Sequence, residues 1–178
     1  MNTCFFALGV LLTVLPTVYL VLAITSTVKF RDRLRNAETA SQKSITVMKP
    51  LCGDEIELEK NLRSFCTQDY PNYQVIFGVR DPCDVAVCIA ERVIQAFPHQ
   101  DISLVIDDQA MGSNLKVSNL INMAPLAKHE IIVVADADMI VGNDYLKTVS
   151  AAFNNDKVGA ATCLYCGSSR GGGHGAWR

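Results

Sequence analysis

The chain alternates between two patterns of apolar and polar residues, one typical of strands and one typical of helices. Five short apolar runs, rich in β-branched residues and closed by turn residues, predict strands. They span residues 44–48, 73–79, 102–106, 131–135 and 158–165. Between them, apolar residues recur every three or four positions, which predicts helices that begin near residues 54, 84, 114 and 143. This alternation predicts an α/β fold with a mostly parallel sheet and helices on both faces.

The spacing within each predicted helix indicates which side chains face the sheet. The expected buried positions are Leu58, Leu62 and Phe65 in the first helix, the stripe from Ala86 to Phe97 in the second, Val117, Leu120 and Ile121 in the third, and Leu146, Val149 and Phe153 in the fourth. On the third helix, Lys116 and Asn119 are three residues apart and are expected to be neighbours on the opposite, polar face.

The run Ile131–Ala135 is apolar without interruption, which predicts a central strand buried on both faces. It ends at Asp136 and Asp138, and ligands of open α/β sheets bind outside the carboxyl ends of the strands. Two carboxylates there suit Mg²⁺ or Mn²⁺, which can in turn hold the phosphates of a nucleotide. The alternative is that both aspartates only end a strand and cap the next turn.

Other polar residues follow the remaining strands and are expected at the same edge of the sheet. They are the loop from Pro50 to Glu55, Asp81, and Lys116. A carboxylate can accept a base N–H and a lysine can meet a diphosphate, so together these residues predict a nucleotide-sugar site. Taken singly, Asp81 reads as a turn residue and Lys116 as a solvated one. The G-x-G-x-x-G and Walker A patterns are absent, which argues against a dehydrogenase and a P-loop ATPase.

The N-terminal residues 4–24 carry no charge and are long enough to cross a bilayer as a helix. A cleaved signal peptide is the alternative, but it typically has a basic start and a shorter apolar core. Basic residues follow within residues 25–43, which predicts a juxtamembrane linker and a cytoplasmic globular part.

The Gly-rich tail at 167–178 predicts disorder. The net charge of −2 gives no basic surface for nucleic acid.

Four segments in order resemble one family. They are KPLCGDE (49–55), NLRSFCTQDYPNYQVIFGVRD (61–81), GSNLKVSNLINM (112–123) and DADMIVGNDYL (136–146). The resemblance is to the ceramide glucosyltransferase type of inverting GT-A glycosyltransferase, and within it to the bacterial hopanoid-associated branch. It covers residues 44–166 and implies a Rossmann-like GT-A nucleotide-binding half behind one membrane helix.

The resemblance also implies the ligands and the residues that meet them. The donor is a UDP-sugar, the cation Mg²⁺ or Mn²⁺, and the acceptor a lipid such as a hopanoid or ceramide, at the bacterial inner membrane. By position, Asp81 resembles the acidic residue on the base, and Asp136 and Asp138 resemble those on the phosphates and the metal. Pro50, Glu55 and Lys116 match positions that line the nucleotide.

The resemblance stops before the family's third acidic motif, its Q/R-x-x-R-W motif and its further membrane helices. We therefore expect a donor-binding half that lacks a catalytic base and is inactive alone. Two alternatives remain open at this stage. One is a non-catalytic, membrane-tethered nucleotide-sugar-binding module, and the other is a metal-dependent nucleotidyltransferase.

Overall fold

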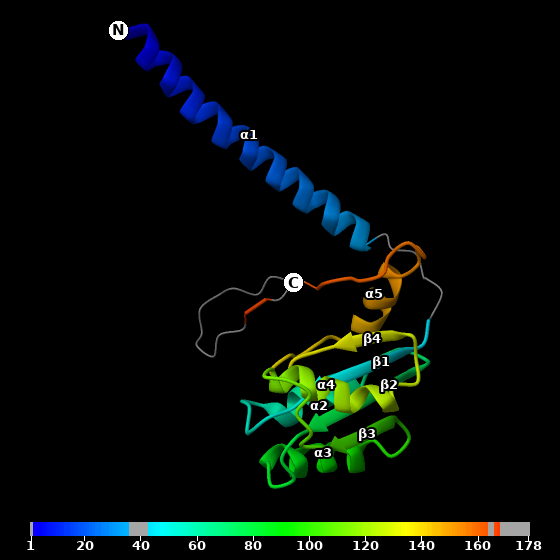
Figure 1. Cartoon of the computed structure of the whole chain (residues 1–178). Helices are drawn as coiled ribbons and strands as arrows, with labels where there is room; N and C mark the ends of the chain where they lie inside the picture. The colour runs from blue at the N-terminus through cyan, green and yellow to red at the C-terminus, as the bar shows by residue number, and fades with distance from the viewer. Residues whose placement is uncertain (1, 36–42, 164–165, 168–178) are drawn as a thin grey trace.

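The computed structural model describes residues 2–35, 43–163 and 166–167. It begins with helix α1, Asn2–Arg35, which projects from the rest of the molecule in Figure 1. Within it, Gly9–Lys29 is long and apolar enough to cross a membrane, and the described side chains of this span are not buried. The basic stretch predicted as a linker is helical as far as Arg35, and residues 36–42 lie outside the described part.

Four parallel strands form the sheet. They are β1 (Ile45–Pro50), β2 (Tyr73–Val79), β3 (Asp101–Ile106) and β4 (Ile131–Val134), in the order β3-β2-β1-β4. In register, Met48 of β1 lies opposite Ile76 of β2 and Val134 of β4. The predicted mostly parallel sheet is confirmed.

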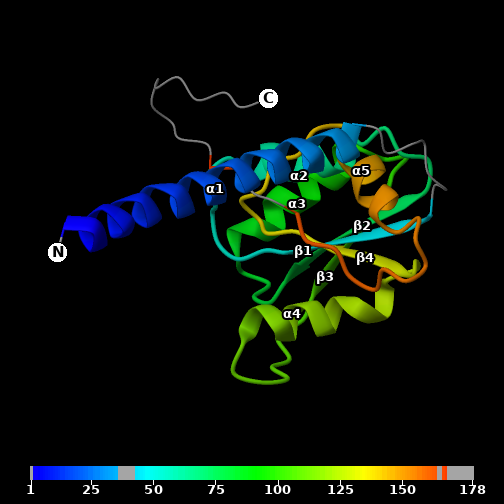
Figure 2. The same ribbon diagram turned by 90° about the horizontal axis from the view of Figure 1, so that it is seen from above.

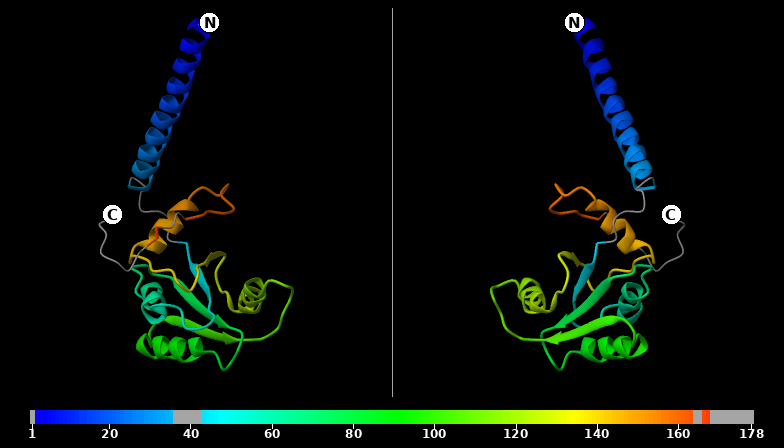
Figure 3. Two further views of the ribbon diagram at one scale, coloured as in Figure 1. Left: turned by 90° about the vertical axis from the view of Figure 1, so that its left-hand side faces the viewer. Right: turned by 90° about the vertical axis from the view of Figure 1, so that its right-hand side faces the viewer.

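Helices cover both faces of the sheet, as predicted. They are α2 (Leu58–Cys66), α3 (Val85–Ala96), α4 (Leu115–Met123) with the short 3-10 helix η1 (Ala124–Leu126), and α5 (Tyr145–Ala152). Figures 2 and 3 show α2 and α3 on one face and α4 on the other. The main core lies on the α2 and α3 side, where Leu58, Leu62 and Phe65 are almost fully buried. Asp84 begins α3 by accepting a hydrogen bond from the N–H of Ala86.

Of the predicted inner face of α4, Leu120 is partly buried against the sheet as expected, but Val117 and Ile121 are not. Val117 and Ile121 are 47% and 44% exposed, whereas Asn119 and Met123 are buried against the sheet. The cause is Gly78 of β2, where an added Cβ would lie 2.3 Å from the sulfur of Met123. Because glycine leaves room for a close approach, α4 packs there, and the amide of Asn119 donates to the carbonyl of Gly78 at 2.9 Å.

The strand that follows α4 and η1 is also placed differently from the prediction. β4 is an edge strand of the described sheet rather than a central one, and Ile132 and Val134 are 47% and 46% exposed. Only Val133 of this strand is buried, because α4 covers β1 and β2 and leaves that face of β4 open.

The fifth predicted strand is absent from residues 158–163, which form no regular element. Residues 164 and 165, which complete that prediction, lie outside the described part of the chain. The predicted tail lies outside it from residue 168 onward.

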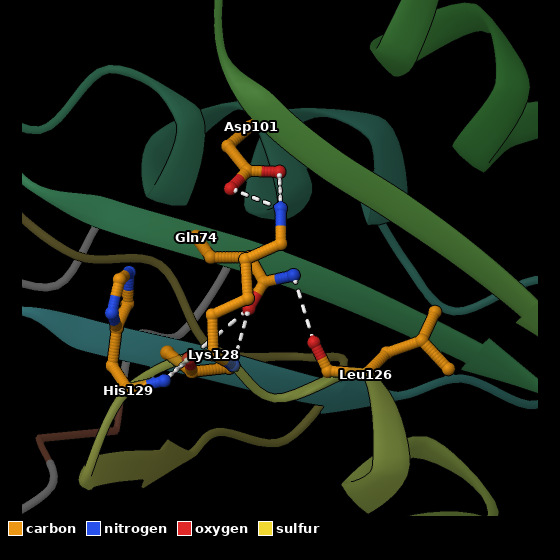
Figure 4. Close-up of polar contacts among 6 residues, drawn as sticks. Gln74, Asp101, Leu126, Lys128 and His129 are labelled. Carbon is orange, nitrogen blue, oxygen red and sulfur yellow. Dashed lines mark hydrogen bonds and ion pairs between the residues drawn. The ribbon is translucent and has the colours of Figure 1, made fainter.

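A buried amide fixes the connection that leads into β4. The side chain of Gln74, 1% exposed, donates to the carbonyl of Leu126 at 3.1 Å and accepts from the N–H of Lys128 at 3.2 Å (Figure 4). The ammonium of Lys128 reaches across the surface to Asp101 at 2.7 Å. These contacts lie at the amino ends of the strands, opposite the edge where the predicted site residues gather.

Candidate functional site

A cavity of about 550 Å³ opens at the carboxyl ends of the strands. Its lining residues are Pro50, Leu51, Cys52, Glu55, Arg80, Asp81, Asp84, Leu115, Lys116, Asn119, Asp136, Ala137 and Asp138. The structure thus brings all six residues predicted from sequence, from Pro50 to Asp138, to one cavity. This is the edge where open α/β sheets bind their ligands.

The turn after β4 carries the two aspartates. The N–H of Ala135 still donates to the carbonyl of Met48 at 3.1 Å, so the sheet ladder continues one residue past β4. The chain then turns, with the N–H of Met139 donating to the carbonyl of Asp136 at 3.2 Å. Asp136 and Asp138 are both exposed on this turn. Their carboxylates therefore belong to a short loop held by the sheet.

Positive charge faces these carboxylates from α4. Asn114 caps that helix by accepting hydrogen bonds from the N–H groups of Lys116 and Val117. The cap holds the first turn of α4 at the cavity, and the Lys116 ammonium forms an ion pair with Asp136. Both partners are about half exposed, so the pair adds little to folding stability. Arg80, which the sequence reasoning missed, also lines the cavity and donates to the carbonyl of Asp108 at 2.6 Å.

Two further aspartates, Asp81 and Asp84, line the same cavity. Asp81 accepts a hydrogen bond from the N–H of Cys83 at 2.8 Å, so it is a turn residue as well as a cavity residue. Asp84 was not predicted to be a site residue. Its carboxylate accepts from the N–H of Gly53 at 2.8 Å and from the N–H of Ala86 at 2.9 Å. It therefore ties the loop after β1 to the start of α3. Gly53 has a φ of +73°, a conformation that favours glycine.

A buried lysine lies beneath the turn of the two aspartates. Lys49 of β1 is fully buried, and its ammonium donates to the carbonyl of Asp136 at 2.7 Å. The same ammonium lies 3.9 Å from the ring centroid of Phe65. Burial lowers the pKa of Lys49 to about 7, against the opposing effects of Asp136 and then Asp138. Sequence alternation carried a signal, because Ile45, Val47 and Lys49 share one face of β1.

The aspartate pair fits a divalent cation that is bound together with a nucleotide. Among the residues that the structure describes, no group of three or more His, Cys, Asp or Glu side chains surrounds a common point. A cage made only of protein ligands is therefore not formed in this part of the chain. Mg²⁺ typically uses one or two carboxylates and completes its shell with substrate phosphates and water. Asp136 and Asp138 supply that number at the wall of a cavity large enough for a ligand.

The parallel sheet, with helices on both faces and an acidic turn at its carboxyl edge, has a GT-A-like fold, as comparison with solved structures shows. A mannosyltransferase from Pyrobaculum calidifontis, solved with GDP-Man and Mn²⁺, superposes with a TM-score of 0.63 at 21% identity, covering 83% of this chain and 46% of that one. The S. aureus TarS 1–349 structure with UDP superposes with a TM-score of 0.50 at 18% identity, covering 62% and 32%.

The family follows from the sequence comparison. The family model described as Glycosyl transferase family 21 matches residues 8–177, and the chain belongs to this family. Ceramide glucosyltransferase 3 of Caenorhabditis elegans is 26% identical over 80% of this chain and 32% of its own length. Ceramide glucosyltransferase of Komagataella phaffii is 28% identical over 71% and 26%. Beta-monoglucosyldiacylglycerol synthase of Trichormus variabilis is 29% identical over 65% and 25%. The chain thus spans about a quarter to a third of these relatives.

Proposed function

We propose that this chain is the donor-binding half of a membrane-anchored, inverting glycosyltransferase that moves a sugar from a UDP-sugar to a lipid. The observation that carries the proposal is the cavity at the carboxyl edge of the sheet. It combines two carboxylates on one turn with the cations Lys116 and Arg80 and the carboxylate of Asp81. The membership of the chain in a glycosyltransferase family supports this use of the cavity.

Each group has a task in this proposal. Asp136 and Asp138 hold Mg²⁺ or Mn²⁺, which supplies charge to stabilise the departing diphosphate. Lys116 and Arg80 line the same cavity and bind the diphosphate as charged hydrogen-bond donors. Asp81 accepts an N–H of the base, while Pro50 and Glu55 border the nucleotide from the loop after β1.

The acceptor is proposed from the relatives and from α1. Two of the relatives named above are a ceramide glucosyltransferase and a monoglucosyldiacylglycerol synthase, and ceramide and diacylglycerol are both lipids. The apolar span Gly9–Lys29 supports an anchor, and the basic residues after it favour a cytoplasmic globular part. Ceramide and hopanoid are the acceptors that we propose to test, with the bacterial inner membrane as the location.

Calorimetry on the full chain in detergent micelles tests the donor site. UDP is titrated with and without Mn²⁺ into the wild-type protein and into Asp138→Ala. We expect Mn²⁺-dependent binding of UDP that Asp138→Ala removes. GDP is the competing nucleotide, because the Pyrobaculum neighbour was solved with GDP-Man. Absence of heat with UDP and Mn²⁺ in a folded wild-type protein would overturn the proposal. Tighter binding of GDP than of UDP would change the proposed donor from a UDP-sugar to a GDP-sugar.

For this chain acting alone, we propose binding without turnover. Among the carboxylates that line the cavity, Asp81 and Asp84 hold backbone N–H groups and Asp136 pairs with Lys116. In the proposal, Asp138 holds the cation together with Asp136, and Glu55 borders the nucleotide. No carboxylate there is assigned to take a proton from an acceptor hydroxyl, which the reaction requires. A sugar-transfer assay with membranes that contain this chain tests the point. Robust glycolipid product would contradict it.

A further inference from the structure

Lys49 is the charged residue that the packing of this fold does not explain. It follows Ile45 and Val47 on one face of β1, and these two residues belong to the main core. An aliphatic residue would continue that face. Instead the face ends in a fully buried ammonium, and burying a charge is costly unless it is paired and hydrogen-bonded. A lysine at such a position is a candidate for a functional task.

The contacts of Lys49 lead to the turn of the two aspartates. Its ammonium donates to the carbonyl of Asp136 at 2.7 Å, and the same carbonyl accepts from the N–H of Met139 at 3.2 Å. One carbonyl oxygen therefore receives both hydrogen bonds. The Met139 bond closes the turn that contains Asp138, and the Lys49 bond fastens that turn to β1.

Lys49 is itself held in place by a ring on α2 and by the strands on either side of β1. The ring of Phe65, fully buried on α2, lies 3.9 Å from the ammonium, and a cation over an aromatic face is attracted to it. β1 is flanked by β2 and β4 and has its backbone bonded on both sides. Lys49 therefore connects a strand that is paired on both sides to an exposed loop.

We propose that Lys49 is a positioning residue, which fixes the Asp136–Met139 turn so that both carboxylates face one cation. This inference rests on the proposed function for its cation. Outer groups that orient metal ligands typically change metal affinity by 10–100-fold when they are replaced. Lys49 touches no substrate in this arrangement, and it acts through the carbonyl of Asp136.

The test compares Lys49→Met, which keeps the length of the side chain and removes its ammonium, with Lys128→Met. Lys128 pairs with Asp101 at the amino ends of the strands, so it is a matched lysine away from the cavity. UDP is titrated into both variants of the full chain in micelles, with and without Mn²⁺. We expect Lys49→Met to weaken Mn²⁺-dependent binding by tenfold or more, to leave metal-free UDP binding unchanged, and Lys128→Met to match the wild type.

A second measurement needs neither metal nor nucleotide. Amide hydrogen exchange of Met139 reports the bond that closes the turn, and we expect it to be faster in Lys49→Met while the amides of β2 keep their protection. Lys49→Arg restores a cation and is expected to slow this exchange again. A folded Lys49→Met protein with wild-type exchange at Met139 would overturn the inference. If exchange rises but the wild type binds no UDP, the proposed function fails and the positioning of the turn stands.

Discussion

β1 and β4 are neighbouring parallel strands of similar apolar sequence, and they differ in what surrounds them. From Ile45 to Lys49, no residue of β1 is more than 3% exposed, and this includes a lysine. In β4, Ile132 and Val134 are nearly half exposed. The comparison shows that burial follows from the neighbours of a strand, since β1 is paired on both sides and β4 is the edge of the described sheet. The carboxyl ends of the two strands nevertheless lead into one cavity, which Pro50 of β1 and the turn after β4 line.

The largest expected difference comes from placing the same charge in both strands. Val47→Asp puts a carboxylate at a fully buried position of β1, whereas Val134→Asp puts it on the open face of β4. An unpaired buried charge costs several kcal/mol, so we expect Val47→Asp to lose about 4 kcal/mol in free energy of unfolding. Val134→Asp should lose less than about 1 kcal/mol. Urea unfolding followed by circular dichroism measures both, and equal losses would remove the distinction between the strands.

The buried lysine of β1 makes stability depend on pH. The pKa of Lys49 is about 7 in the folded chain against an ordinary value of 10.5, so the unfolded chain binds more protons between these values. The contribution of Lys49 to the free energy of unfolding is therefore fully present above pH 10.5, and it is lost as pH falls from 10.5 to 7. Relative to Lys49→Met, the wild type should gain on the order of 2 kcal/mol between pH 7 and 9.

The interval from pH 7 to 9 separates Lys49 from its neighbour Cys66. Burial raises the pKa of the Cys66 thiol from 9.0 to about 12, so its opposing effect, a loss of stability as pH rises, begins only near pH 9. Urea unfolding midpoints of the wild type and of Lys49→Met at several pH values measure how their difference in stability changes with pH. Parallel pH profiles for the wild type and Lys49→Met would contradict the assignment.

A smaller effect is expected where α4 packs on β2. Gly78→Ala would place a Cβ 2.3 Å from the Met123 sulfur and 2.5 Å from the Asn119 amide oxygen, so these side chains or α4 itself must shift. Overpacking of this kind costs about 1–3 kcal/mol. Gly159→Ala is the control, because nothing lies within 4 Å of its added Cβ. Thermal unfolding compares the two, and a Gly78→Ala protein as stable as the control would show that α4 does not depend on this contact.

The smallest expected effect concerns the ion pair at the amino ends of the strands. Lys128 and Asp101 are 2.7 Å apart, with side chains 56% and 43% exposed. Exposed pairs contribute about 0–1 kcal/mol, and salt screens them. Lys128→Met should therefore change the free energy of unfolding by less than about 0.5 kcal/mol. A larger loss, measured by urea unfolding at low and high salt, would show that this pair supports the connection into β4.

The sequence allowed the strands to be predicted well where local pattern and turn chemistry agree. β2 has its predicted bounds, Tyr73–Val79, because a turn precedes it and Asp-Pro follows it. The helix after it begins next to the predicted residue 84, and the structure shows Asp84 as its cap. The errors arose where tertiary neighbours decide. The buried face of α4 depends on Gly78, and the exposure of β4 depends on which elements lie beside it.

The candidate site divides in the same way. The residues predicted to share one edge do line one cavity, because parallel strands all end on the same side. Arg80, Lys49 and Asp84 were missed, since each meets a backbone group that sequence does not locate. These groups are the carbonyls of Asp108 and Asp136 and the N–H of Gly53. The roles proposed for the cavity residues in ligand binding remain predictions, and the titrations described above test them.

Helix α1 has a geometric consequence for how the proposed enzyme would meet its acceptor. In the proposed membrane arrangement, the six residues from 30 to 35 continue the helix past the apolar span by about 9 Å. In this arrangement a short segment tethers the donor cavity close to the lipid headgroups. A tethered site searches a surface instead of a volume, so acceptor encounters depend on lateral density in the leaflet and no longer on bulk concentration.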